Sequence, residues 1–572
     1  MTFPSRSGGQ ILVDALAIHG VDIAFGVPGE SYLDVLDALH DSSIRFIVNR
    51  QEGGAAFMAE AYGKFTGRPG ICFVTRGPGA TNASIGVHTA FQDSTPMILF
   101  IGQVGGDFVE REAFQEIDYR RMYGEMAKWV AQIDRAERIP EYLARAFQVA
   151  TSGRPGPVVL ALPEDMLVAR ASVADTGHYT PVQASPAAAQ VARLRAMLAA
   201  SRRPVVIVGG ATWNDAACAN LRRFAEANHL PVACAFRFQD LLDNQHPHYI
   251  GDVGIGINPT LAARIADADL VIALGPRLGE MTTGGYTLLA APVPQQRLVH
   301  IHTDAEELGR VYQAELMINS GAPQACAMLA AMEPVDASAW QDSVGQARAE
   351  LAAWQACPPI FADTDDATAP PLNLWLAVQE LMAQAPRDTI ITNGAGNYAT
   401  WAHRFYRYGP MRTQLAPTSG AMGYSVPAGI AAKIVDPART VVTFAGDGEF
   451  LMNGQELATA VQYGAGVIIL VFNNGMYGTI RMHQERGYPG RVSGTDLRNP
   501  DFAALARAYG ASGETVETTA QFGPALARAL QFTRMQSLPA LIELRYDGNL
   551  LTPGATLATI RANALKAQSN HP

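Results

Sequence analysis

The chain of 572 residues is 48% hydrophobic and 17% charged, and its formal net charge at pH 7 is −10. This composition argues against a disordered chain, because enough apolar surface is available to build sizeable cores. The acidic balance argues against a general affinity for nucleic acid or for an anionic membrane, which a basic surface would provide. At roughly 100–200 residues per domain, the length predicts about three to four domains or one large multilayer unit.

The cysteines and the N-terminal segment bear on the location of the protein. The five cysteines are scattered and form no CxxC pair: Cys72, Cys218, Cys234, Cys326 and Cys357. We therefore expect neither a disulfide framework nor a cysteine metal site, and a cytoplasmic location. Residues 1–20 lack the basic start and long apolar run of a signal peptide and predict an amphipathic helix. No stretch approaches about 18 uninterrupted apolar residues, so no transmembrane helix is expected.

Two segments of linker composition, residues 168–190 and 357–372, divide the chain into predicted domains at 1–170, 190–335 and 370–550. In each domain, nearly continuous apolar runs alternate with helical stretches, which is typical of parallel sheets covered on both faces. The predicted strands are Arg45–Asn49, Ile71–Thr75, Met97–Ile101, Pro204–Val208, Leu270–Leu274, Leu298–Ile301, Thr389–Thr392, Val441–Ala445, Val467–Phe472 and Ala540–Leu544. The predicted helices include Glu52–Phe65, Ala80–Ala90, Gly454–Tyr463 and Asp501–Ala508. We therefore predict an α/β protein of three consecutive doubly wound parallel-sheet domains, whose ligands bind beyond the carboxyl ends of the strands.

Polar residues follow two consecutive predicted strands of the last domain. Gly446-Asp447-Gly448 follows the strand Val441–Ala445, and Asn473-Asn474 follows the strand Val467–Phe472. Because both strands belong to one βαβ unit, we expect both polar tips at the same edge of the sheet. An aspartate, an asparagine and a carbonyl from the following turn suit Mg²⁺, which would complete its shell with water and diphosphate oxygens. The glycines and the following helix N-terminus suit the diphosphate itself, although each motif alone is also typical of an ordinary turn or strand exit.

The segment Val441–Gly478 resembles the thiamine diphosphate (ThDP) motif of the acetolactate synthase and pyruvate decarboxylase superfamily, which is GDG, a spacer and NN. The resemblance implies that Asp447, Asn474 and the backbone carbonyl of Met476 hold Mg²⁺. It implies that Met422 wedges under the two rings of the cofactor, with ordinary core packing as the alternative. The full set of cofactor-binding residues that it implies is Gly396, Asn397, Tyr398, Gly420, Met422, Gly446, Gly448, Glu449, Asn474 and Met476.

Further motifs of the same family occur in chain order, so the resemblance extends over all three predicted domains. The segment around Glu52 resembles the family's RHE-x-GAA pattern, with Gln51 in place of its histidine and Gly53 in place of its usual glutamine. The resemblance implies that Glu52 shares a proton with the pyrimidine ring of the cofactor and so activates it. The other matching motifs are Gly77–Asn82, Ala113–Glu116, Gly153–Pro157 and Ser419–Tyr424.

Two further catalytic candidates bear on the outcome of the reaction. Gln115 lies in an AFQE motif that resembles acetolactate synthase, whereas the family's decarboxylases carry a His-His pair nearby and residues 103–123 contain no histidine. Glu30 replaces the final glycine of the synthase pattern FGYPGG, where decarboxylases of the family place Asp or Ser. We expect Glu30 to donate a proton or to select the acceptor. The alternative is an exposed acid that stabilises a helix N-terminus.

The middle domain leaves the presence of FAD open. Leu274–Leu278 is similar to the LGARF motif of the acetolactate synthases that bind FAD, but Gly251–Gly256 replaces their GMLGMHG motif. Arg277 pairs with a flavin diphosphate in one interpretation and with a surface carboxylate in the other. In this family, the two cofactor-binding domains of one site come from two subunits. The resemblance therefore implies a homodimer or homotetramer with active sites at the subunit interface.

We predict an enzyme that uses ThDP and Mg²⁺ to decarboxylate a 2-oxo acid, pyruvate or an analogue, and then joins the product to a second carbonyl compound. The alternatives are a 2-oxo acid decarboxylase that releases an aldehyde, a lyase of 2-hydroxyacyl thioesters, and a non-catalytic paralogue that keeps the fold. The predicted partners are small molecules, a 2-oxo acid and a carbonyl acceptor, with neither nucleic acid nor a membrane among them.

Overall fold

The computed structural model describes residues 3–361, 372–409 and 411–569. The chain forms two compact units, Met1–Ala184 and Ser185–Pro572. Three six-stranded sheets, one in the first unit and two in the second, consist of parallel strands with helices between them, which confirms the predicted α/β class. Within the described ranges, no helix is long and apolar enough to span a membrane.

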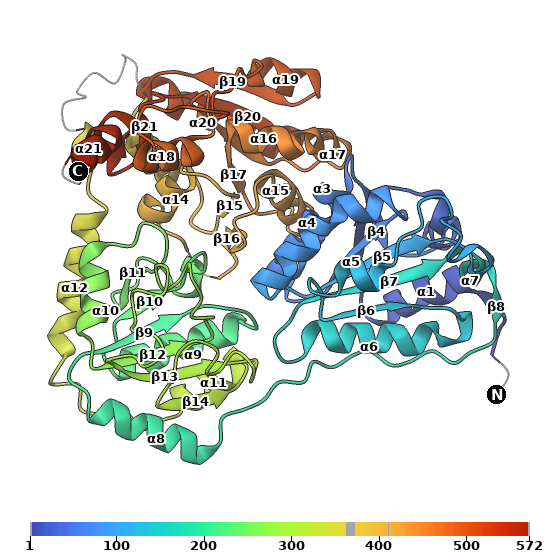
Figure 1. Ribbon diagram of the computed structural model, residues 1–572, viewed down its shortest axis with the longest axis horizontal. Helices are drawn as coiled ribbons and strands as arrows, with labels where there is room; N and C mark the ends of the chain where they lie inside the picture. The colour runs from blue at the N-terminus through green and yellow to red at the C-terminus, as the bar shows by residue number, and fades with distance from the viewer. Residues whose placement is uncertain (1–2, 362–371, 410, 570–572) are drawn as a thin grey trace. The chain divides into compact units, whose positions relative to one another are not determined.

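The first unit contains a sheet with the strand order β3-β2-β4-β5-β7-β6. Its strands are β2 (Ile23–Gly26), β3 (Arg45–Val48), β4 (Gly70–Val74), β5 (Met97–Gln103), β6 (Trp129–Gln132) and β7 (Pro157–Pro163). Its helices are α1 (Gly8–Ile18), η1 (Glu30–Tyr32), α2 (Leu33–His40), α3 (Glu52–Thr66), α4 (Pro78–Asp93), η2 (Gly106–Phe108), α5 (Tyr119–Tyr123), η3 (Ala136–Arg138), α6 (Ile139–Thr151) and α7 (Glu164–Val168). Helices α1 and α6 cover one face of the sheet, and α3 and α4 cover the other (Figure 1).

The structure bears differently on the two predicted linkers. The segment 168–190 begins with a strand, β8 (Arg170–Ala171), which pairs antiparallel with β1 (Arg6–Ser7). Two residues of strand are too few to leave a period in the sequence, which is why the pattern did not indicate it. Of the second predicted linker, 357–372, most residues lie outside the described part of the chain, and so do residues 370–371 at the start of the third predicted domain.

The middle sheet belongs to the second unit and has the strand order β11-β10-β9-β12-β13-β14. Its strands are β9 (Pro204–Val208), β10 (Val232–Cys234), β11 (Tyr249–Asp252), β12 (Leu270–Leu274), β13 (Arg297–His302) and β14 (Leu316–Asn319). Its helices are α8 (Ala188–Ala199), α9 (Asp215–Ala227), η4 (Gln239–Leu241), α10 (Pro259–Asp267), α11 (Ala322–Ala330) and α12 (Gln341–Trp354). Along β9, Val206 and Val208 pack with α8, α9 and α11, whereas Val205 and Ile207 pack with α10. This alternation buries both faces and makes the sheet doubly wound.

The C-terminal sheet, also in the second unit, has the strand order β16-β15-β17-β18-β20-β19. Its strands are β15 (Ile390–Asn393), β16 (Gln414–Leu415), β17 (Val441–Gly446), β18 (Ile468–Asn473), β19 (Ser512–Val516) and β20 (Ala540–Arg545). Its helices are η5 (Pro359–Phe361), α13 (Leu374–Gln384), α14 (Ala399–Phe405), α15 (Ser425–Val435), α16 (Asp447–Asn453), η6 (Gly454–Glu456), α17 (Leu457–Gln462), α18 (Gly478–Gly487), α19 (Phe502–Ala508) and α20 (Thr519–Gln536). Helices α13, α14 and α20 share one core with β17 and β18, and α15 packs on the opposite face.

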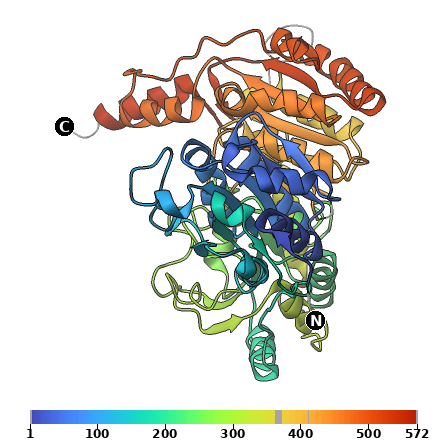
Figure 2. The same cartoon turned by 90° about the vertical axis from the view of Figure 1, so that its right-hand side faces the viewer.

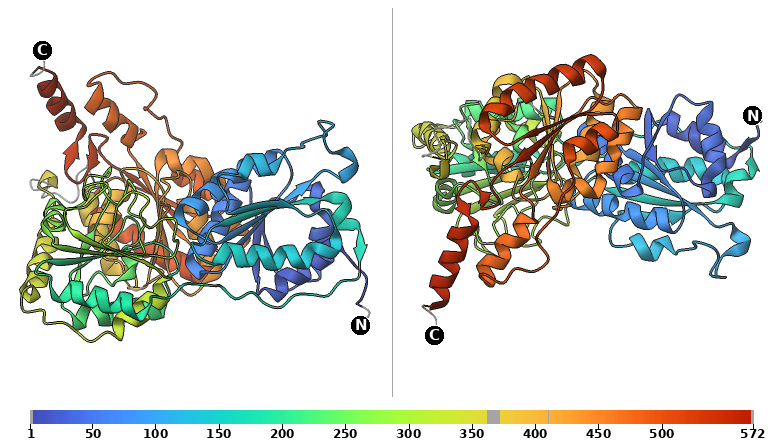
Figure 3. Two further views of the ribbon diagram at one scale, coloured as in Figure 1. Left: turned by 60° about the horizontal axis from the view of Figure 1, so that its bottom comes forward. Right: turned by 90° about the horizontal axis from the view of Figure 1, so that it is seen from above.

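The chain ends with a short hairpin and a helix beside α18. Strands β21 (Leu550–Thr552) and β22 (Ala555–Thr556) pair antiparallel and lead into α21 (Leu557–Ser569). Helix α21 projects away from the C-terminal sheet (Figure 2) and lies beside α18 (Figure 3). Because α18 begins just after Asn473-Asn474, the C-terminal helix packs against the continuation of the predicted metal motif.

Candidate active site

The strand orders place the predicted site residues at the points where ligands bind to such sheets. Numbered in chain order within each sheet, the first-unit and C-terminal sheets both have the order 2-1-3-4-6-5. The middle sheet has the order 3-2-1-4-5-6, that of the Rossmann fold. The order reverses between β2 and β4, between β15 and β17, and between β9 and β12. Ligands of open α/β sheets bind beyond the carboxyl ends of the strands at this reversal.

In the C-terminal sheet, both polar motifs lie at one edge, as predicted. Strands β17 and β18 are parallel neighbours with Gly446 opposite Phe472, so the residues that follow them leave the sheet side by side. Asp447 is the first residue of α16 and is only 3% exposed. Its Oδ2 accepts hydrogen bonds from the backbone N–H of Gly475 at 2.9 Å and from Nδ2 of Asn499 at 2.8 Å. One carboxylate therefore connects the two motifs directly.

Burial and hydrogen bonding act on the Asp447 carboxyl in opposite directions. Burial raises its pKa above the ordinary value, and the donors from Gly448, Asn499 and Gly475 counteract this effect. A cation beside the carboxylate would also favour the charged form. The donor set therefore suits a bound divalent cation. Within the described residues, no group of three or more His, Cys, Asp or Glu side chains could hold a metal, and the predicted set is of another kind, with one carboxylate, one amide and one carbonyl.

Asn473 has a structural role that the motif alone did not reveal. Its Oδ1 accepts from the N–H of Gly475 at 3.1 Å and from Nδ2 of Asn499 at 2.9 Å, and its Nδ2 donates to Glu543 at 2.7 Å. Asn474, the predicted ligand, is half-buried, and its Oδ1 accepts from the N–H of Met476 at 3.3 Å. Asn499 lies in a loop far along the chain with no motif around it, so no sequence signal pointed to it.

The predicted diphosphate loops flank the reversal between β15 and β17. The first turn of α16 begins at Asp447, and the N–H groups of a first helical turn have no partner within the helix. A Cβ atom on Gly446 would lie 2.9 Å from the ring of Tyr398, and one on Gly448 would lie 2.5 Å from the ring of Tyr477. A side chain at either position would force the tyrosine ring to move. The arrangement therefore presents backbone donors and bare backbone to an anion, as a diphosphate site requires.

The side chains of Glu449 and Tyr398 are buried and point at each other. The Tyr398 hydroxyl donates to the Glu449 carboxyl and accepts from the N–H of Gly394 at 3.1 Å. Ser425 Oγ donates to the same carboxyl at 3.0 Å. Burial raises the pKa of Glu449, and the positive charge of Arg237 lowers it by a smaller amount, so the resulting pKa is about 8. The Glu449 side chain is engaged by Tyr398 and Ser425. We therefore expect Glu449 to contact a diphosphate through its backbone N–H.

The remaining cofactor residues of the C-terminal sheet lie on nearby loops. Asn397 Oδ1 accepts from the Thr479 hydroxyl at 3.0 Å, which ties the Gly396–Tyr398 loop to the start of α18. Gly420 is exposed with φ of +68°, a conformation that favours glycine. Met422 is half-buried, so part of its side chain is accessible to a ligand. This exposure favours the wedge interpretation over ordinary core packing.

In the first unit, Glu52 begins α3 at the carboxyl edge of the sheet, directly after β3. The Gln51 side chain accepts from the N–H of Gly54 at 3.0 Å and caps the helix, which explains why glutamine replaces the family's histidine without loss of the helix start. Asn82, at the end of the motif Gly77–Asn82, donates to the Glu52 carboxylate at 2.9 Å. Two separate sequence motifs therefore meet at this carboxylate.

Glu30 and Gln115 belong to the same edge of the first-unit sheet. Glu30 follows β2 on η1, and its side chain is 67% exposed, with one carboxylate oxygen 3.6 Å from Nη2 of Arg76. Gln115 is half-buried in the loop after β5 and has φ of +65°. The geometry is compatible with both interpretations of Glu30, a catalytic acid and an exposed acid at a helix start. At this edge of the sheet, the sequence reasoning missed Arg76.

Comparison with known proteins identifies the class. Residues 6–122 match the N-terminal TPP binding domain of thiamine pyrophosphate enzymes, residues 191–329 match their central domain, and residues 394–544 match their C-terminal TPP binding domain. The chain belongs to the thiamine pyrophosphate enzymes, and it is an enzyme dependent on thiamine diphosphate, the same cofactor.

Within that class, the chain is similar to acetolactate synthase large subunits along nearly its whole length. It is 32% identical to the acetolactate synthase isozyme 2 large subunit of Escherichia coli, over 96% of this chain and 98% of that protein. It is 31% identical to a probable acetolactate synthase large subunit of Methanocaldococcus jannaschii, over 97% and 95% of the two chains. The acetolactate synthase large subunit of Parasynechococcus marenigrum is 34% identical, over 92% and 86%.

Proposed function

We propose that this enzyme uses ThDP and Mg²⁺ to decarboxylate a 2-oxo acid, pyruvate or a close analogue, and to join the resulting acyl group to a second carbonyl compound. The observation that carries the proposal is the edge between β17 and β18, where the buried Asp447 carboxylate and the Asn473-Asn474 turn meet. The similarity to acetolactate synthase large subunits supports the same reaction.

The site residues lie at two sheet edges. We call the edge of the C-terminal sheet with Asp447, Asn474 and Met476 the binding edge, and the edge of the first-unit sheet with Glu52, Glu30 and Gln115 the reaction edge. When bound, ThDP would supply a nucleophilic carbon and a cationic thiazolium ring that accepts the electrons released with CO₂. Asp447, Asn474 and the Met476 carbonyl would hold Mg²⁺, and the first turn of α16 would hold the diphosphate. Glu52 would exchange a proton with the pyrimidine ring, in the position that Asn82 fixes. Met422 and the Gly420 carbonyl would hold the rings.

Gln115 and the absence of histidine from residues 103–123 favour carboligation over aldehyde release. The alternatives remain an aldehyde-releasing decarboxylase and a lyase of 2-hydroxyacyl thioesters. The presence of Glu52, Asp447 and Asn474 argues against a non-catalytic paralogue.

The assembly, the domain bounds, the flavin and the location are further parts of the proposal. The reaction edge and the binding edge lie in different compact units, which fits a homodimer or homotetramer with active sites at the subunit interface. The domains stay predicted at 1–170, 190–335 and 370–550.

The Rossmann strand order of the middle sheet supports FAD. Arg277, however, lies 3.5 Å from Glu307, which favours the ion-pair interpretation of that residue. Visible absorbance of the purified enzyme tests for flavin. The cytoplasmic location stays a prediction from the cysteines.

Product analysis tests the central proposal. The enzyme is incubated with ThDP, Mg²⁺ and a panel of 2-oxo acids, each alone and with an added aldehyde, and the products are identified by mass spectrometry. We expect hydroxy ketones or 2-hydroxy-2-alkyl-3-oxo acids together with released CO₂. Acetaldehyde as the sole product from pyruvate, with or without an acceptor, would contradict the ligase assignment and support the decarboxylase.

A further inference from the structure

Arg76 connects three segments at the carboxyl edge of the first-unit sheet. It follows β4 and directly precedes the motif Gly77–Asn82, and the residue is only 8% exposed. Its Nε donates to the Phe114 carbonyl at 3.1 Å, and its Nη1 donates to the Glu164 carboxylate at 3.1 Å. Its Nη2 lies 3.6 Å from the Glu30 carboxylate. One planar guanidinium thus contacts the loops that follow β2, β5 and β7, a use of several donors that lysine could not reproduce.

The contact with Phe114 fixes the loop that carries Gln115. A Cβ atom on Gly77 would lie 2.8 Å from the Cβ atom of Gln115, so the two backbones touch at this point. The N–H of Gly77 also donates to the Tyr119 hydroxyl at 2.9 Å, just beyond the loop. Within the loop, the Glu116 carboxylate accepts from the N–H groups of Glu110 and Ala113 at 2.8 and 3.0 Å. Hydrogen bonds to Glu116 therefore close the loop internally, and Arg76 and Gly77 attach the loop to the edge of the sheet.

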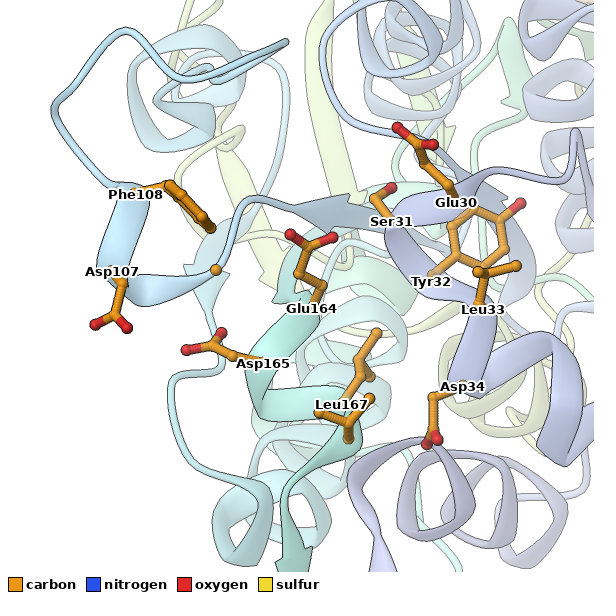
Figure 4. A pocket seen from close by; sticks show the side chains of 12 residues that line it. Glu30, Ser31, Tyr32, Leu33, Asp34, Asp107, Phe108, Glu164, Asp165 and Leu167 are labelled. Atoms are coloured by element: carbon orange, nitrogen blue, oxygen red, sulfur yellow. The ribbon is translucent and has the colours of Figure 1, made fainter.

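The other two contacts of Arg76 face a pocket of about 360 Å³. Figure 4 shows Glu164 between Glu30 on η1 and the η2 residues Asp107 and Phe108, all of which line this pocket. Glu30 comes from the loop after β2 and Arg76 from the loop after β4, so the pair spans the reversal of the strand order where a ligand is expected. The guanidinium therefore pairs with the Glu30 carboxylate at that point.

Arg76 has no predicted role, yet its side chain contacts two regions with predicted catalytic residues. It pairs with Glu30 directly, and it contacts the Gln115 loop through the Phe114 carbonyl. Glu30 and Gln115 were both assigned to the step that decides the product, rather than to activation of the cofactor. We propose that Arg76 is a positioning residue that sets the partition between carboligation and aldehyde release, by holding Glu30 and the Gln115 loop in one arrangement. This inference rests on the proposed function.

The test compares Arg76→Gln and Arg76→Lys with Arg68→Gln. Arg68 is a matched control in the same unit, since it pairs with Asp22 at 3.0 Å but is 44% exposed and contacts neither loop. The first readout is amide hydrogen exchange of residues 104–118 in the enzyme without added ThDP. The second is the amount of ligated product per CO₂ released, with kcat and KM for the acceptor, in the enzyme loaded with ThDP and Mg²⁺.

We expect Arg76→Gln to accelerate exchange in residues 104–118 about tenfold, because the loop loses its attachment to the sheet edge. The partition should shift about fivefold or more toward aldehyde, whereas CO₂ release stays within about twofold, since cofactor activation is left intact. Arg76→Lys should pair with one carboxylate but release the Phe114 carbonyl, which gives fast exchange and an intermediate partition. Arg68→Gln should match the wild type in both readouts.

Unchanged exchange in Arg76→Gln would overturn the inference whatever the reaction is. A parallel loss of CO₂ release and ligation would also overturn it, because a residue that only supports the fold lowers both together. A wild-type enzyme that releases no CO₂ from any 2-oxo acid would instead contradict the proposed function, and the partition claim with it. If Arg76→Gln fails to fold, Glu164→Gln, which removes one partner of the guanidinium, is expected to change both readouts in the same direction by smaller amounts.

Discussion

The first-unit and C-terminal sheets have the same strand order but place opposite chemistry at the reversal point. At the C-terminal sheet, glycines and the first turn of α16 present backbone donors, and the buried carboxyl groups of Asp447 and Glu449 lie in that turn. At the first-unit sheet, the charged side chains of Glu30 and Arg76 follow the two strands at the reversal, β2 and β4, and Glu52 follows the neighbouring strand β3. The fold supplies an edge where a ligand can bind, and the residues after the strands decide whether that edge holds a diphosphate or moves protons. The comparison predicts that mutations at the two edges have different kinetic signatures.

The largest effect is expected at the reaction edge. Glu52→Gln keeps the shape of the side chain and its contact with Asn82 but removes the carboxylate that exchanges a proton. Turnover should fall by roughly 10²–10⁴-fold, the contribution of a positioned acid or base. The affinity for ThDP, measured by isothermal titration with Mg²⁺ present, should stay near the wild-type value. A variant with undiminished turnover would refute the assigned role.

The binding edge should respond in the opposite way. Asp447→Asn removes the one carboxylate from the predicted metal set while it keeps a side chain of the same size. We expect the Mg²⁺-dependent affinity for ThDP to fall roughly 100-fold, or about 2.8 kcal/mol. Asp501→Asn is a suitable control, since this exposed carboxylate caps α19 without a place at the edge. Equal ThDP affinity in Asp447→Asn and the wild type would remove the metal assignment.

A smaller effect on ThDP affinity is expected from a substitution in the middle domain, because Arg237 of that domain contacts the loops of the binding edge. Arg237 is buried and donates to the carbonyls of Pro417 and, at 2.7 Å, Gly394, the first residue of the loop that leads to Tyr398. Arg237→Met should weaken ThDP binding about tenfold, or about 1.4 kcal/mol, because the loop loses its anchor. Arg222→Met is the control, since Arg222 forms an exposed pair with Glu226. Wild-type titration curves for both variants would show that the contact is only structural.

The smallest effect concerns α21 and depends on pH. Glu485 on α18 accepts from Nε and Nη2 of Arg561 on α21, at 2.8 and 2.6 Å, and this pairing lowers the pKa of Glu485 to about 2. The pairing therefore stabilises α21 fully above the ordinary pKa of about 4.5 and is lost as the pH falls toward 2.

Hydrogen-exchange protection factors of residues 557–569 measure this effect. They should fall across that acidic range in the wild type and should be low at every pH in Arg561→Gln. The exposed pair of Arg528 with Glu514 gives the control, Arg528→Gln, which should leave the helix protected. Protection that is independent of pH down to 2 would contradict the ion-pair account.

The sequence predicted the sheets better than the contacts around the site. Each predicted strand overlaps an observed one, and Leu270–Leu274 matches β12 residue for residue, because buried parallel strands are continuous apolar runs. Eight strands of the three sheets were not predicted, among them β2, the continuous apolar β7 and the short edge strand β6, Trp129–Gln132. The short β16 was missed as well, because Gln414–Leu415 has only two residues.

The same limit applies to the candidate site. Asp447 and Asn474 were predictable because they follow two strands of one βαβ unit, and local order along the chain fixes where such residues lie. Asn499 and Arg76 were not, because their roles depend on loops far apart in sequence that meet only after folding. Glu449 was predicted as a diphosphate contact, but its buried hydrogen bond to Tyr398 arises from β15 and β17 lying side by side, which no motif records.

We propose that the two edges act on one cofactor from two different subunits. Glu52→Gln and Asp447→Asn should be co-expressed with different tags, the mixed species purified by both, and all species assayed at a ThDP concentration that saturates the wild type but lies well below the Kd of Asp447→Asn, where each parent has little activity. In a mixed dimer, one active site carries both substitutions and the other carries neither, so the purified hybrid should recover about half of the wild-type turnover per dimer. A mixed dimer with no more activity than either parent would contradict the claim and place both edges of a site within one subunit.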